Sequence, residues 1–544
     1  MIRMTLMLIP MAMARMRESP WSSVEGPLGL TLVAAPPVIQ DGGEVIISWK
    51  NLDQEHPNDY VTLTCGPTAD KNDFLQLRNV SSHFVQFDDL YMLRCPYEAH
   101  YYRYGKDGES QLLGSISIPM VDSFNTPKQG HLGFTDAIDE MVIMYNSAST
   151  QTPQVKFGTT SHNLNNIRSG KSTTYKASDM CHEPATTIGQ KFFRSPGYFH
   201  SVVMDGLVPL SEYFYQYGND LDGWSAIRSF ISRPALGDNT TISFIAYADM
   251  GVDDSPRGWS TSLRVFEDVV NKDYNSFLLH FGDISYARGV GYMWDKYFAL
   301  IEPVATRIPY LVSIGNHEFD YISGGEHDPS HLESFHPSWG NYGADSSGEC
   351  GVPMVHRFHA PSNGRGLFWY SFEYGLATVI QMSSEHNFLP GSLQHSWLQA
   401  TLAGIDRTRT PWIILTAHRM MYTTQMGEEE DLRVSLHFRA AVEPLLQQYK
   451  VNLVLTGHQH SYERSCPVYQ GKCVENGTVH MVVGSAGAEL EQQGFSDQIG
   501  EWSVSHINAF GYLRGHISRT KMHLEFVLNT NGNVYDQVEL RPWQ

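Results

Sequence analysis

Short runs of alternating apolar and polar residues dominate the first part of the chain. They are residues 44–49, 60–64, 140–145, 198–207, 212–217 and 224–230. Turn residues separate these runs, and a period of two is typical of strands with one buried face. The pattern predicts two consecutive β-sandwiches, over residues 25–127 and 128–235.

The pattern changes after residue 240, where continuous apolar runs alternate with stretches of helical spacing. We expect strands at residues 242–248, 275–281, 309–314, 376–381, 412–416 and 451–456, and helices at residues 259–271, 292–302, 392–402 and 433–449. Buried strands that alternate with helices indicate an α/β domain. It is expected to cover residues 240–475, and short strands within residues 476–544 complete it.

Composition and charge narrow the class of protein. The chain has 544 residues, of which 42% are apolar and 18% charged, which fits a folded protein of several domains. The formal net charge of −20 disfavours nucleic acid as a specific partner, because a phosphate backbone attracts Lys and Arg. An anionic phosphate substrate would need local positive charge, which bound metal cations supply.

The N-terminus resembles a secretory leader. Arg3 precedes an apolar stretch over residues 4–14 whose end reads A-x-A. A leader over residues 1–24 is predicted, and the alternatives are a wrongly assigned start or a buried segment. Because no other stretch reaches the ~18 apolar residues of a membrane helix, no membrane span is expected.

Cysteines and glycosylation motifs agree with a secretory route. The six cysteines form no C-x-x-C motif. Cys466 and Cys473 bracket a short loop and could pair, Cys65 with Cys95 is a second candidate pair, and six reduced thiols are the alternative. N-x-S/T sequons begin at Asn79, Asn239 and Asn476. Together with the leader, these features predict a disulfide-bonded glycoprotein that is secreted or held in another secretory compartment.

Five of the predicted strands end in polar clusters. The clusters are Ala248-Asp249-Met250-Gly251, Gly282-Asp283-Ile284-Ser285-Tyr286, Gly315-Asn316-His317-Glu318, Ala417-His418-Arg419 and Gly457-His458-Gln459-His460. Open α/β sheets bind ligands at the carboxyl ends of their strands, so these loops are expected to converge. Asp, Asn and Tyr offer oxygen atoms and His offers nitrogen, and seven such donors suit two ions that share a bridging carboxylate.

In this order the clusters resemble the purple acid phosphatase signature GDxG, GDxxY, GNH(D/E), VxxH and GHxH. The tyrosine of the second block, Tyr286 here, separates this family from the wider metallophosphoesterase superfamily. Residues 281–287, 348–353, 368–371 and 457–466 are similar to the high-molecular-weight plant-type group. The resemblance covers about residues 130–535 and implies an α+β multidomain fold, in which fibronectin-III-like β-sandwiches precede an αββα metallophosphoesterase domain.

The resemblance also implies a role for each donor. The ferric ion would be held by Asp249, Asp283, Tyr286 and His460. The divalent ion, which is zinc, manganese or iron in the family, would be held by Asp283, Asn316, His418 and His458. Asp283 would bridge the two ions, and tyrosinate on Fe(III) gives the family its purple colour. Asn316 and His317 would bind substrate, with His317 as the catalytic residue beside the leaving group.

The sequence departs from the family pattern in three places. Ala248 replaces the first glycine and Leu415 replaces a valine, which leaves the ligands intact. Residues 419–425 contain no histidine, whereas smaller plant enzymes carry a His-His pair there that binds phosphate and protonates the leaving group. His317, His386 and Arg419 are the candidate substitutes. The acidic run 428–431 is expected to be the solvated start of a helix, with a regulatory cation site as the alternative.

These features predict an acid phosphatase that hydrolyses monoesters of small phosphate compounds. Hydroxide bound to the Fe(III)–M(II) pair would be the nucleophile, so activity is expected to be highest in mildly acidic buffer. One alternative is a nucleotide pyrophosphatase or phosphodiesterase on the same centre, which the missing His-His pair favours. The other is a metal-containing binding protein with weak catalysis. The sequence leaves the oligomeric state open.

Overall fold

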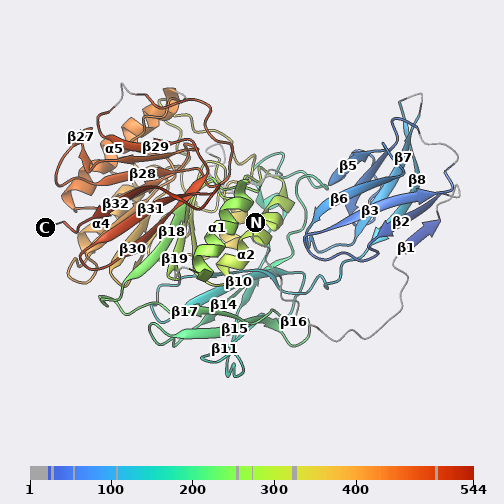
Figure 1. The fold of residues 1–544 in the computed structure, drawn as a ribbon, viewed down its shortest axis with the longest axis horizontal. Coiled ribbons are helices and arrows are strands. Elements are labelled where there is room, and N and C mark those ends of the chain that lie inside the picture. Colours follow the sequence, from blue (N-terminus) through green and yellow to red (C-terminus); the bar gives the residue numbers. More distant parts are fainter. Residues whose placement is uncertain are drawn as a thin grey trace. The chain divides into compact units, whose positions relative to one another are not determined.

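A computed structural model describes residues 22–25, 30–52, 56–105, 108–252, 257–271, 274–320, 328–427, 429–496 and 500–543. The predicted leader lies, apart from its last three positions, outside the described residues. The chain divides into two compact units (Figure 1): the first runs to Leu90 and includes Cys95–Asp122, and the second comprises Tyr91–Arg94 and Ser123–Gln544. None of the described helices has the length and apolar character needed to cross a bilayer.

The first unit contains two four-stranded sheets. Their orders are β1 (Ser22–Glu25), β2 (Thr31–Ala35), β3 (Gly43–Lys50), β6 (Phe84–Leu90), and β5 (Gln76–Asn79), β4 (Tyr60–Cys65), β7 (Tyr97–Tyr104), β8 (Ser110–Ile118). In β3 every second residue is buried, so Val45, Ile47 and Trp49 form one apolar face. Trp49 packs against Tyr101 of the other sheet with ring centroids 4.9 Å apart, so the two sheets share a core.

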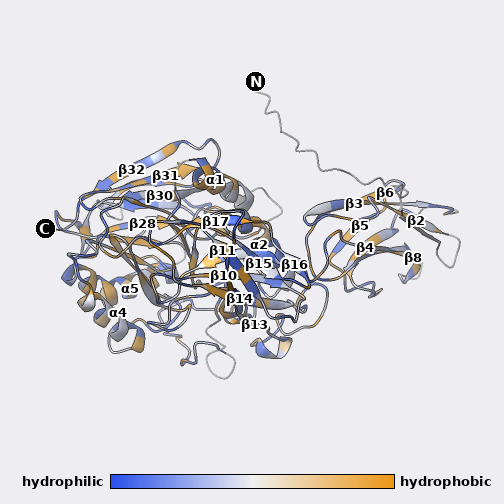
Figure 2. Cartoon of the chain, turned by 90° about the horizontal axis from the view of Figure 1, so that it is seen from below, coloured by the Kyte–Doolittle hydropathy of each residue, from blue (hydrophilic) through white to orange (hydrophobic). Residues whose placement is uncertain are grey.

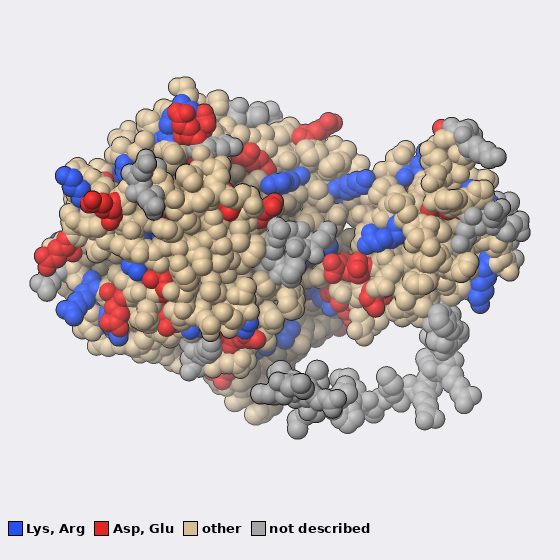
Figure 3. Space-filling model, turned by 45° about the horizontal axis from the view of Figure 1, so that its top comes forward, with Lys and Arg blue, Asp and Glu red and all other residues tan. Residues whose placement is uncertain are grey.

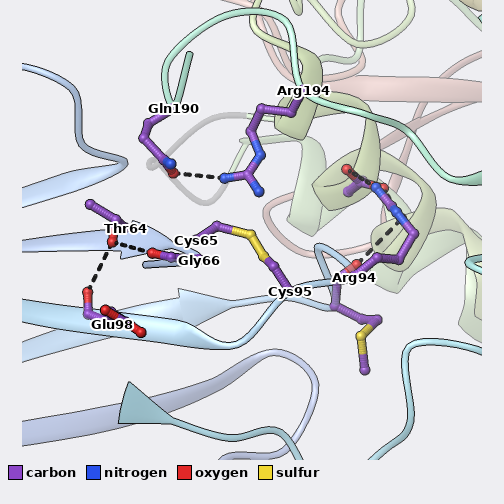
Figure 4. The surroundings of a disulfide bond; sticks show 10 residues. Thr64, Cys65, Gly66, Arg94, Cys95, Glu98, Gln190 and Arg194 are labelled. Carbon is purple, nitrogen blue, oxygen red and sulfur yellow. Dashed lines mark hydrogen bonds and ion pairs between the residues drawn. A yellow bond between two sulfur atoms is a disulfide. The ribbon is translucent and has the colours of Figure 1, made fainter. Parts of the chain in front are cut away.

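A disulfide joins two neighbouring strands of this unit. It links Cys65, the last residue of β4, to Cys95, which lies just before β7 (Figure 4). Beside it, the Thr64 hydroxyl donates a hydrogen bond to the Gly66 carbonyl at 3.0 Å. The predicted pairing of these two cysteines is confirmed.

The second unit begins with a further sandwich. One sheet has the order β13 (Lys171–Thr173), β14 (Tyr198–Met204), β10 (Met141–Ser147), β9 (Lys128–Gly133). The other has the order β12 (Asn166–Ser169), β11 (Gln154–Gly158), β15 (Glu212–Asn219), β16 (Gly223–Trp224), with β17 (Arg228–Ile231) also paired to β15. The rings of Tyr145 on β10 and Tyr217 on β15 lie 4.9 Å apart and join the two sheets.

The prediction of a single strand over residues 224–230 is wrong for the middle of this segment. The chain leaves β16 after Trp224 and enters β17 at Arg228. The Ser225 side chain accepts a hydrogen bond from the Tyr217 backbone N–H at 3.1 Å, so a hydroxyl takes the place of a backbone partner. Ile227 is exposed in the resulting loop.

Two mixed sheets form the centre of the α/β part. One has the order β20 (Tyr310–Ser313), β19 (Phe277–Phe281), β18 (Ile242–Tyr247), β30 (Gly511–Ile517), β31 (Met522–Leu528), β32 (Val534–Leu540). The other has the order β21 (Tyr370–Tyr374), β22 (Ala377–Gln381), β23 (Trp412–Thr416), β24 (Leu453–Thr456), β28 (Val479–Val483), β25 (Tyr462–Ser465), β29 (Ser503–Ile507). Strands β18–β20 are parallel to one another, as are β22–β24, because helical crossovers connect most of them.

Helices cover the outer faces of both sheets. Figure 2 shows α1 (Arg257–Asn271) beside β30–β32 and, on the opposite side, α4 (Leu393–Gly404) and α5 (Glu429–Gln448) below β28. The helix α2 (Gly291–Ala305) lies with α1, and its Tyr297 hydroxyl is 2.9 Å from His280 Nδ1 on β19. Between the sheets, the rings of Phe277 and Phe372 lie 5.6 Å apart. These layers are those of the predicted αββα sandwich.

Two further disulfides fix loops of the second unit. Cys466 pairs with Cys473 around the hairpin of β26 (Val468–Tyr469) and β27 (Lys472–Cys473), as predicted. Cys181 pairs with Cys350, just before the short helix α3 (Val352–Arg357). The alternative of six reduced thiols is therefore wrong. On the face shown in Figure 3, acidic and basic side chains are interspersed rather than gathered into one patch.

Candidate metal centre

All of the predicted metal ligands lie in loops after the carboxyl ends of parallel strands. They are Asp249 after β18, Asp283 and Tyr286 after β19, Asn316 after β20, His418 after β23, and His458 and His460 after β24. Three of these strands belong to one central sheet and two to the other. Stacking of the two sheets brings the five loops together.

Asp283 belongs to two groups of potential metal ligands. One consists of Asp283, His418 and His458, the other of Asp249, Asp283 and His460, and within each group the ligand atoms lie within 4.8 Å of one another. His418 Nε2 is 3.3 Å from Asp283 Oδ1, and His460 Nε2 is 3.4 Å from Asp249 Oδ1. A single carboxylate shared by two groups suits a pair of ions.

Tyr286 and Asn316 complete the two groups. The Tyr286 hydroxyl is 3.2 Å from Asp249 Oδ1 and 2.9 Å from His460 Nε2. Asn316 Oδ1 is 3.0 Å from both His418 Nε2 and His458 Nδ1. The structure thus brings all seven predicted ligands together, with one group on each side of Asp283.

Each histidine of the centre has its other ring nitrogen against an acceptor outside the centre. These contacts are His418 Nδ1 to the Phe281 carbonyl (3.2 Å), His460 Nδ1 to the Glu489 carbonyl (2.6 Å) and His458 Nε2 to Asp431 Oδ1 (3.0 Å). A carbonyl or carboxylate oxygen only accepts, so these nitrogens carry a proton. In a neutral ring the remaining nitrogen then has a free lone pair, and in all three rings it faces the centre.

The donor set fits two metal ions. Asn316 Nδ2 donates to Asp345 Oδ2 at 2.9 Å, which turns the amide oxygen toward the two imidazoles. That oxygen and the two imidazole lone pairs all accept, so a cation between them satisfies all three. Mixed carboxylate, amide, phenol and imidazole ligands suit iron and zinc.

The loops that carry the ligands have unusual backbone conformations. Asp249, Asp283 and His458 have φ values of 61°, 50° and 70°, in the left-handed region that residues other than glycine rarely adopt. The buried Glu318 carboxylate stabilises one of these turns by accepting three backbone hydrogen bonds. Its donors are the N–H groups of Asp283 (2.8 Å), Ile284 (2.7 Å) and Gly315 (3.0 Å).

Burial and the carboxylates shift the protonation equilibria of the centre. Burial raises the pKa of Glu318 to about 8, and the Asp283 charge adds to this effect. Burial lowers the pKa of His418, but Asp283 and Asp249 more than offset it and raise the pKa to about 10. The pKa of His460 is raised to about 9, because its hydrogen bond and ion pair with Asp249 outweigh burial. A metal ion bound here would therefore compete with protons, and its binding would release them.

His317 lies at the edge of the centre. Its backbone N–H donates to Asp283 Oδ1 at 2.9 Å, and its ring Nε2 is 3.8 Å from Asp283 Oδ2. Nδ1 faces the Asp345 carbonyl at 3.1 Å, so the proton lies on Nδ1 in the neutral ring. The His317 side chain is 16% exposed, whereas that of His418 is 0% exposed, so His317 lies on the open side.

Arg419, a candidate substrate-binding residue, is buried, and its guanidinium is paired with other side chains of the protein. Its guanidinium binds Glu385 through Nε at 2.9 Å and donates to Asn341 Oδ1 at 2.7 Å. It also contacts Asp431 Oδ1 at 3.4 Å. These contacts give Arg419 a supporting position behind His458.

Asp431 is half-buried and faces the candidate centre, so it is not part of a solvated helix start. It lies in the first turn of α5, and its Oδ1 also accepts a hydrogen bond from Asn341 Nδ2 at 2.6 Å. Burial raises the pKa of Asp431, but His458 and Arg419 outweigh this effect and hold it below its ordinary value. The expectation for the acidic run is wrong at this residue, because the helix start faces the centre. Glu428 lies outside the described residues.

His386 lies in an aromatic environment. Its ring packs 4.3 Å from the Phe319 ring and 4.9 Å from the Phe368 ring, and Nδ1 is 2.8 Å from the Ser383 hydroxyl. Burial lowers the pKa of His386 to about 3. The imidazole is therefore neutral and serves as a core side chain.

Sequence reasoning missed the residues that support the ligands. They are Glu318, Asp345, Glu385 and Asp431. Glu318 stands within a recognised cluster and could have been suspected. The other three lie in loops or at a helix start, where an acidic residue is ordinarily solvated.

The stacked sheets and the two ligand groups around one carboxylate define a calcineurin-like metallophosphoesterase. Residues 242–462 match the family described as "Calcineurin-like phosphoesterase", residues 127–232 match "Purple acid Phosphatase, N-terminal domain", and residues 477–537 match "Iron/zinc purple acid phosphatase-like protein C". The chain belongs to the purple acid phosphatase family.

Relatives support this placement over most of the chain. "Probable inactive purple acid phosphatase 9" of Arabidopsis thaliana is 33% identical over 76% of this chain and 67% of its own length. "Nucleotide pyrophosphatase/phosphodiesterase" of Hordeum vulgare is 30% identical over 58% of this chain and 86% of its own length. The structure of a purple acid phosphatase from yellow lupin (Lupinus luteus) seeds has a TM-score of 0.78 at 26% identity, covering 93% of this chain and 95% of that chain.

Proposed function

We propose that this phosphoesterase is an acid phosphatase that hydrolyses small phosphate monoesters with a bound Fe(III) and a divalent zinc, manganese or iron ion. The observation that carries the proposal is the orientation of the donors. Six oxygen and nitrogen donors surround the shared Asp283, and the three imidazoles, when neutral, direct lone pairs inward. Asp249, Asp283, Tyr286 and His460 would hold Fe(III), and Asp283, Asn316, His418 and His458 the divalent ion.

The protein's own groups would orient the substrate beside the ions. When bound, the two ions supply Lewis acidity and make hydroxide available below neutral pH. When its ring is charged, His317, on the open side, can donate a hydrogen bond from Nε2 to a phosphoryl oxygen or protonate the leaving oxygen. The Asp345 carbonyl holds the His317 ring, and the Asp345 carboxylate holds Asn316. Substrate recognition is thus assigned to His317 and Asn316, and His386 is left out of it.

Two observations bear on the alternatives. The relative from Arabidopsis is named inactive, yet here every ligand of the centre is present and oriented, which favours catalysis over a purely binding role. A nucleotide pyrophosphatase or phosphodiesterase is the second candidate. It is favoured by Arg419, which stands at the position of the missing His-His pair and is paired with Glu385, and by the name of the relative from Hordeum vulgare.

Metal content, visible absorption and hydrolysis of two esters of one phenol test the proposal. We expect one iron and one divalent ion per chain, a tyrosinate band that Tyr286→Phe abolishes and Tyr535→Phe retains, and a kcat/KM at pH 5 that is higher for the monoester than for the diester. His317→Ala should lower kcat by about 10²–10⁴-fold with unchanged metal content. Metal-loaded protein that is inert toward both esters would favour the binding role, and a preference for the diester would favour the second candidate.

The route through the cell is a further part of the proposal. Asn79, Asn239 and Asn476 are all exposed, and all six cysteines are in disulfides. These features support secretion and glycosylation at the three sequons. Release of peptide-N-glycosidase-sensitive glycans from secreted protein would test this, and unglycosylated protein retained in the cytosol would contradict it.

A further inference from the structure

An exposed arginine borders the metal centre without belonging to its ligands. Arg288 lies two residues after Tyr286, in the loop that follows β19. Its guanidinium carbon is 5.6 Å from the centroid of the Tyr286 ring, and the centroid of the His317 ring is 4.5 Å from the same point. A positive charge therefore stands beside Tyr286, a candidate metal ligand whose ring also packs against His317.

The backbone of the loop that carries this arginine is confined. Arg288 has a φ of 49°, and the following Gly289 has a φ of 81°. A Cβ atom on Gly289 would lie 3.0 Å from the Ala185 nitrogen and 3.2 Å from the Ser347 carbonyl oxygen, so two other segments confine the loop. Left-handed conformations at residues other than glycine persist where the surroundings enforce them, and they often occur at functional sites.

Arg288 lies on the side from which a substrate can approach. The side chains of His317 and His460 are 16% and 20% exposed, whereas that of Asp283 is 2% exposed. The other guanidinium at the centre, that of Arg419, is buried against Glu385.

We propose that Arg288 binds a second phosphate group of the substrate and thereby favours phosphoanhydrides, such as inorganic pyrophosphate and nucleoside diphosphates, over simple monoesters. This inference rests on the proposed function. A guanidinium binds phosphate oxygens through two parallel hydrogen bonds. With the terminal phosphate on the metal centre, the next phosphate would lie beside Tyr286 and within reach of Arg288. Water adds to the terminal phosphorus and gives up a proton to solvent, the bond from that phosphorus to the bridging oxygen breaks, and the bridging oxygen leaves with the second phosphate.

Arginine variants and two substrates test this assignment. In metal-loaded protein, Arg288→Ala should lower kcat/KM for inorganic pyrophosphate by about 10–100-fold, mainly through KM, and for p-nitrophenyl phosphate by clearly less. Arg288→Lys should recover part of the loss. Arg541→Ala removes an exposed arginine after β32 and should change neither value. Equal losses with both substrates, or no loss with pyrophosphate, would overturn the proposal.

Binding separates this proposal from the proposed function. Calorimetric titration of metal-loaded protein with methylenediphosphonate and with methylphosphonate needs no turnover. We expect Arg288→Ala to weaken binding of the diphosphonate at least tenfold and that of the monophosphonate by less. One outcome is that the wild-type protein hydrolyses neither the phosphate monoester nor the diester, while Arg288→Ala still weakens diphosphonate binding more than monophosphonate binding. In that case the catalytic proposal fails and the role of Arg288 stands. If the two ligands are affected equally, the role of Arg288 fails.

Discussion

Asp431 shows how a residue outside the ligand set can determine the state of a ligand. Its Oδ1 lies 3.0 Å from His458 Nε2, so the proton of the neutral ring is held on that nitrogen and Nδ1 faces Asn316. Arg419 and Asn341 hold the carboxylate in turn. Such partners fix both the ring orientation and the basicity of a metal-binding histidine.

Replacement of Asp431 by Asn should therefore weaken metal binding. The introduced amide is a weaker, neutral acceptor and leaves Arg419 with less compensating charge, so we expect the affinity for the divalent ion to fall about 10–100-fold. Equilibrium dialysis followed by elemental analysis measures this directly. Glu430→Gln is the matched control, because Glu430 lies in the same helical turn but pairs with Arg433 at the surface. Unchanged affinity in Asp431→Asn would contradict the assigned role.

The candidate ligands were accessible to sequence reasoning because each stands next to a glycine or a buried strand in a recognisable cluster. The acceptors that orient the three candidate histidine ligands could not be predicted from the sequence. Two of the three are backbone carbonyls, at Phe281 and Glu489, which carry no residue-specific signal. The third, Asp431, lies in an acidic run whose ordinary interpretation is a solvated helix start.

At the scale of elements, tight turns after the parallel strands bring the ligands together. Gly315, between β20 and Asn316, shows the constraint most directly. A Cβ atom there would lie 2.6 Å from the Asp283 nitrogen and would collide with Asp283 Oδ1, and it would lie 3.0 Å from His418 Cγ. The β20 turn therefore packs against ligands from both central sheets.

Gly315→Ala should displace Asp283 and reduce metal binding. The added methyl group cannot be accommodated by movement of a flexible side-chain end alone, and overpacking of this kind costs about 1–3 kcal/mol. We expect substoichiometric metal in elemental analysis and a lower midpoint in thermal unfolding. Gly404→Ala, at the end of α4, is the control because no atom lies within 4 Å of its new Cβ. Full metal occupancy in Gly315→Ala would refute the expectation.

Most elements of the α/β part were predictable because buried strands and amphipathic helices have distinct periods. Each strand expected between residues 242 and 456 is present, with ends shifted by a few residues. The edge strands β21 and β29 were missed, since only alternate residues of β21 are buried and none of β29 is. The break between β16 and β17 depends on one Ser225 hydrogen bond, which no hydrophobic pattern encodes.

For the molecule as a whole, buried carboxyl groups connect stability to pH. Glu349 lies beside the disulfide at Cys350, and both of its oxygens accept from Trp294 Nε1, at 3.2 and 3.1 Å. Burial raises the pKa of Glu349 from 4.5 to about 8. Between these values the folded state keeps a proton that the unfolded chain releases. The contribution of Glu349 is therefore fully present below about pH 4.5 and is lost as the pH rises toward 8.

Glu349→Gln should remove this component of the pH dependence. The amide keeps an acceptor for the Trp294 N–H but cannot ionise, so we expect Tm to fall less between pH 5 and pH 8 in the variant than in the wild type, by about a few degrees. Thermal unfolding followed by circular dichroism at fixed metal loading measures the difference. Glu212→Gln, on the exposed face of β15, should keep the wild-type slope. Parallel curves for Glu349→Gln and the wild type would show that Glu349 is already ionised in the fold at pH 5. A smaller fall in Tm for Glu349→Gln would instead link the stability of the second unit to mildly acidic conditions, in which its metal centre is proposed to work.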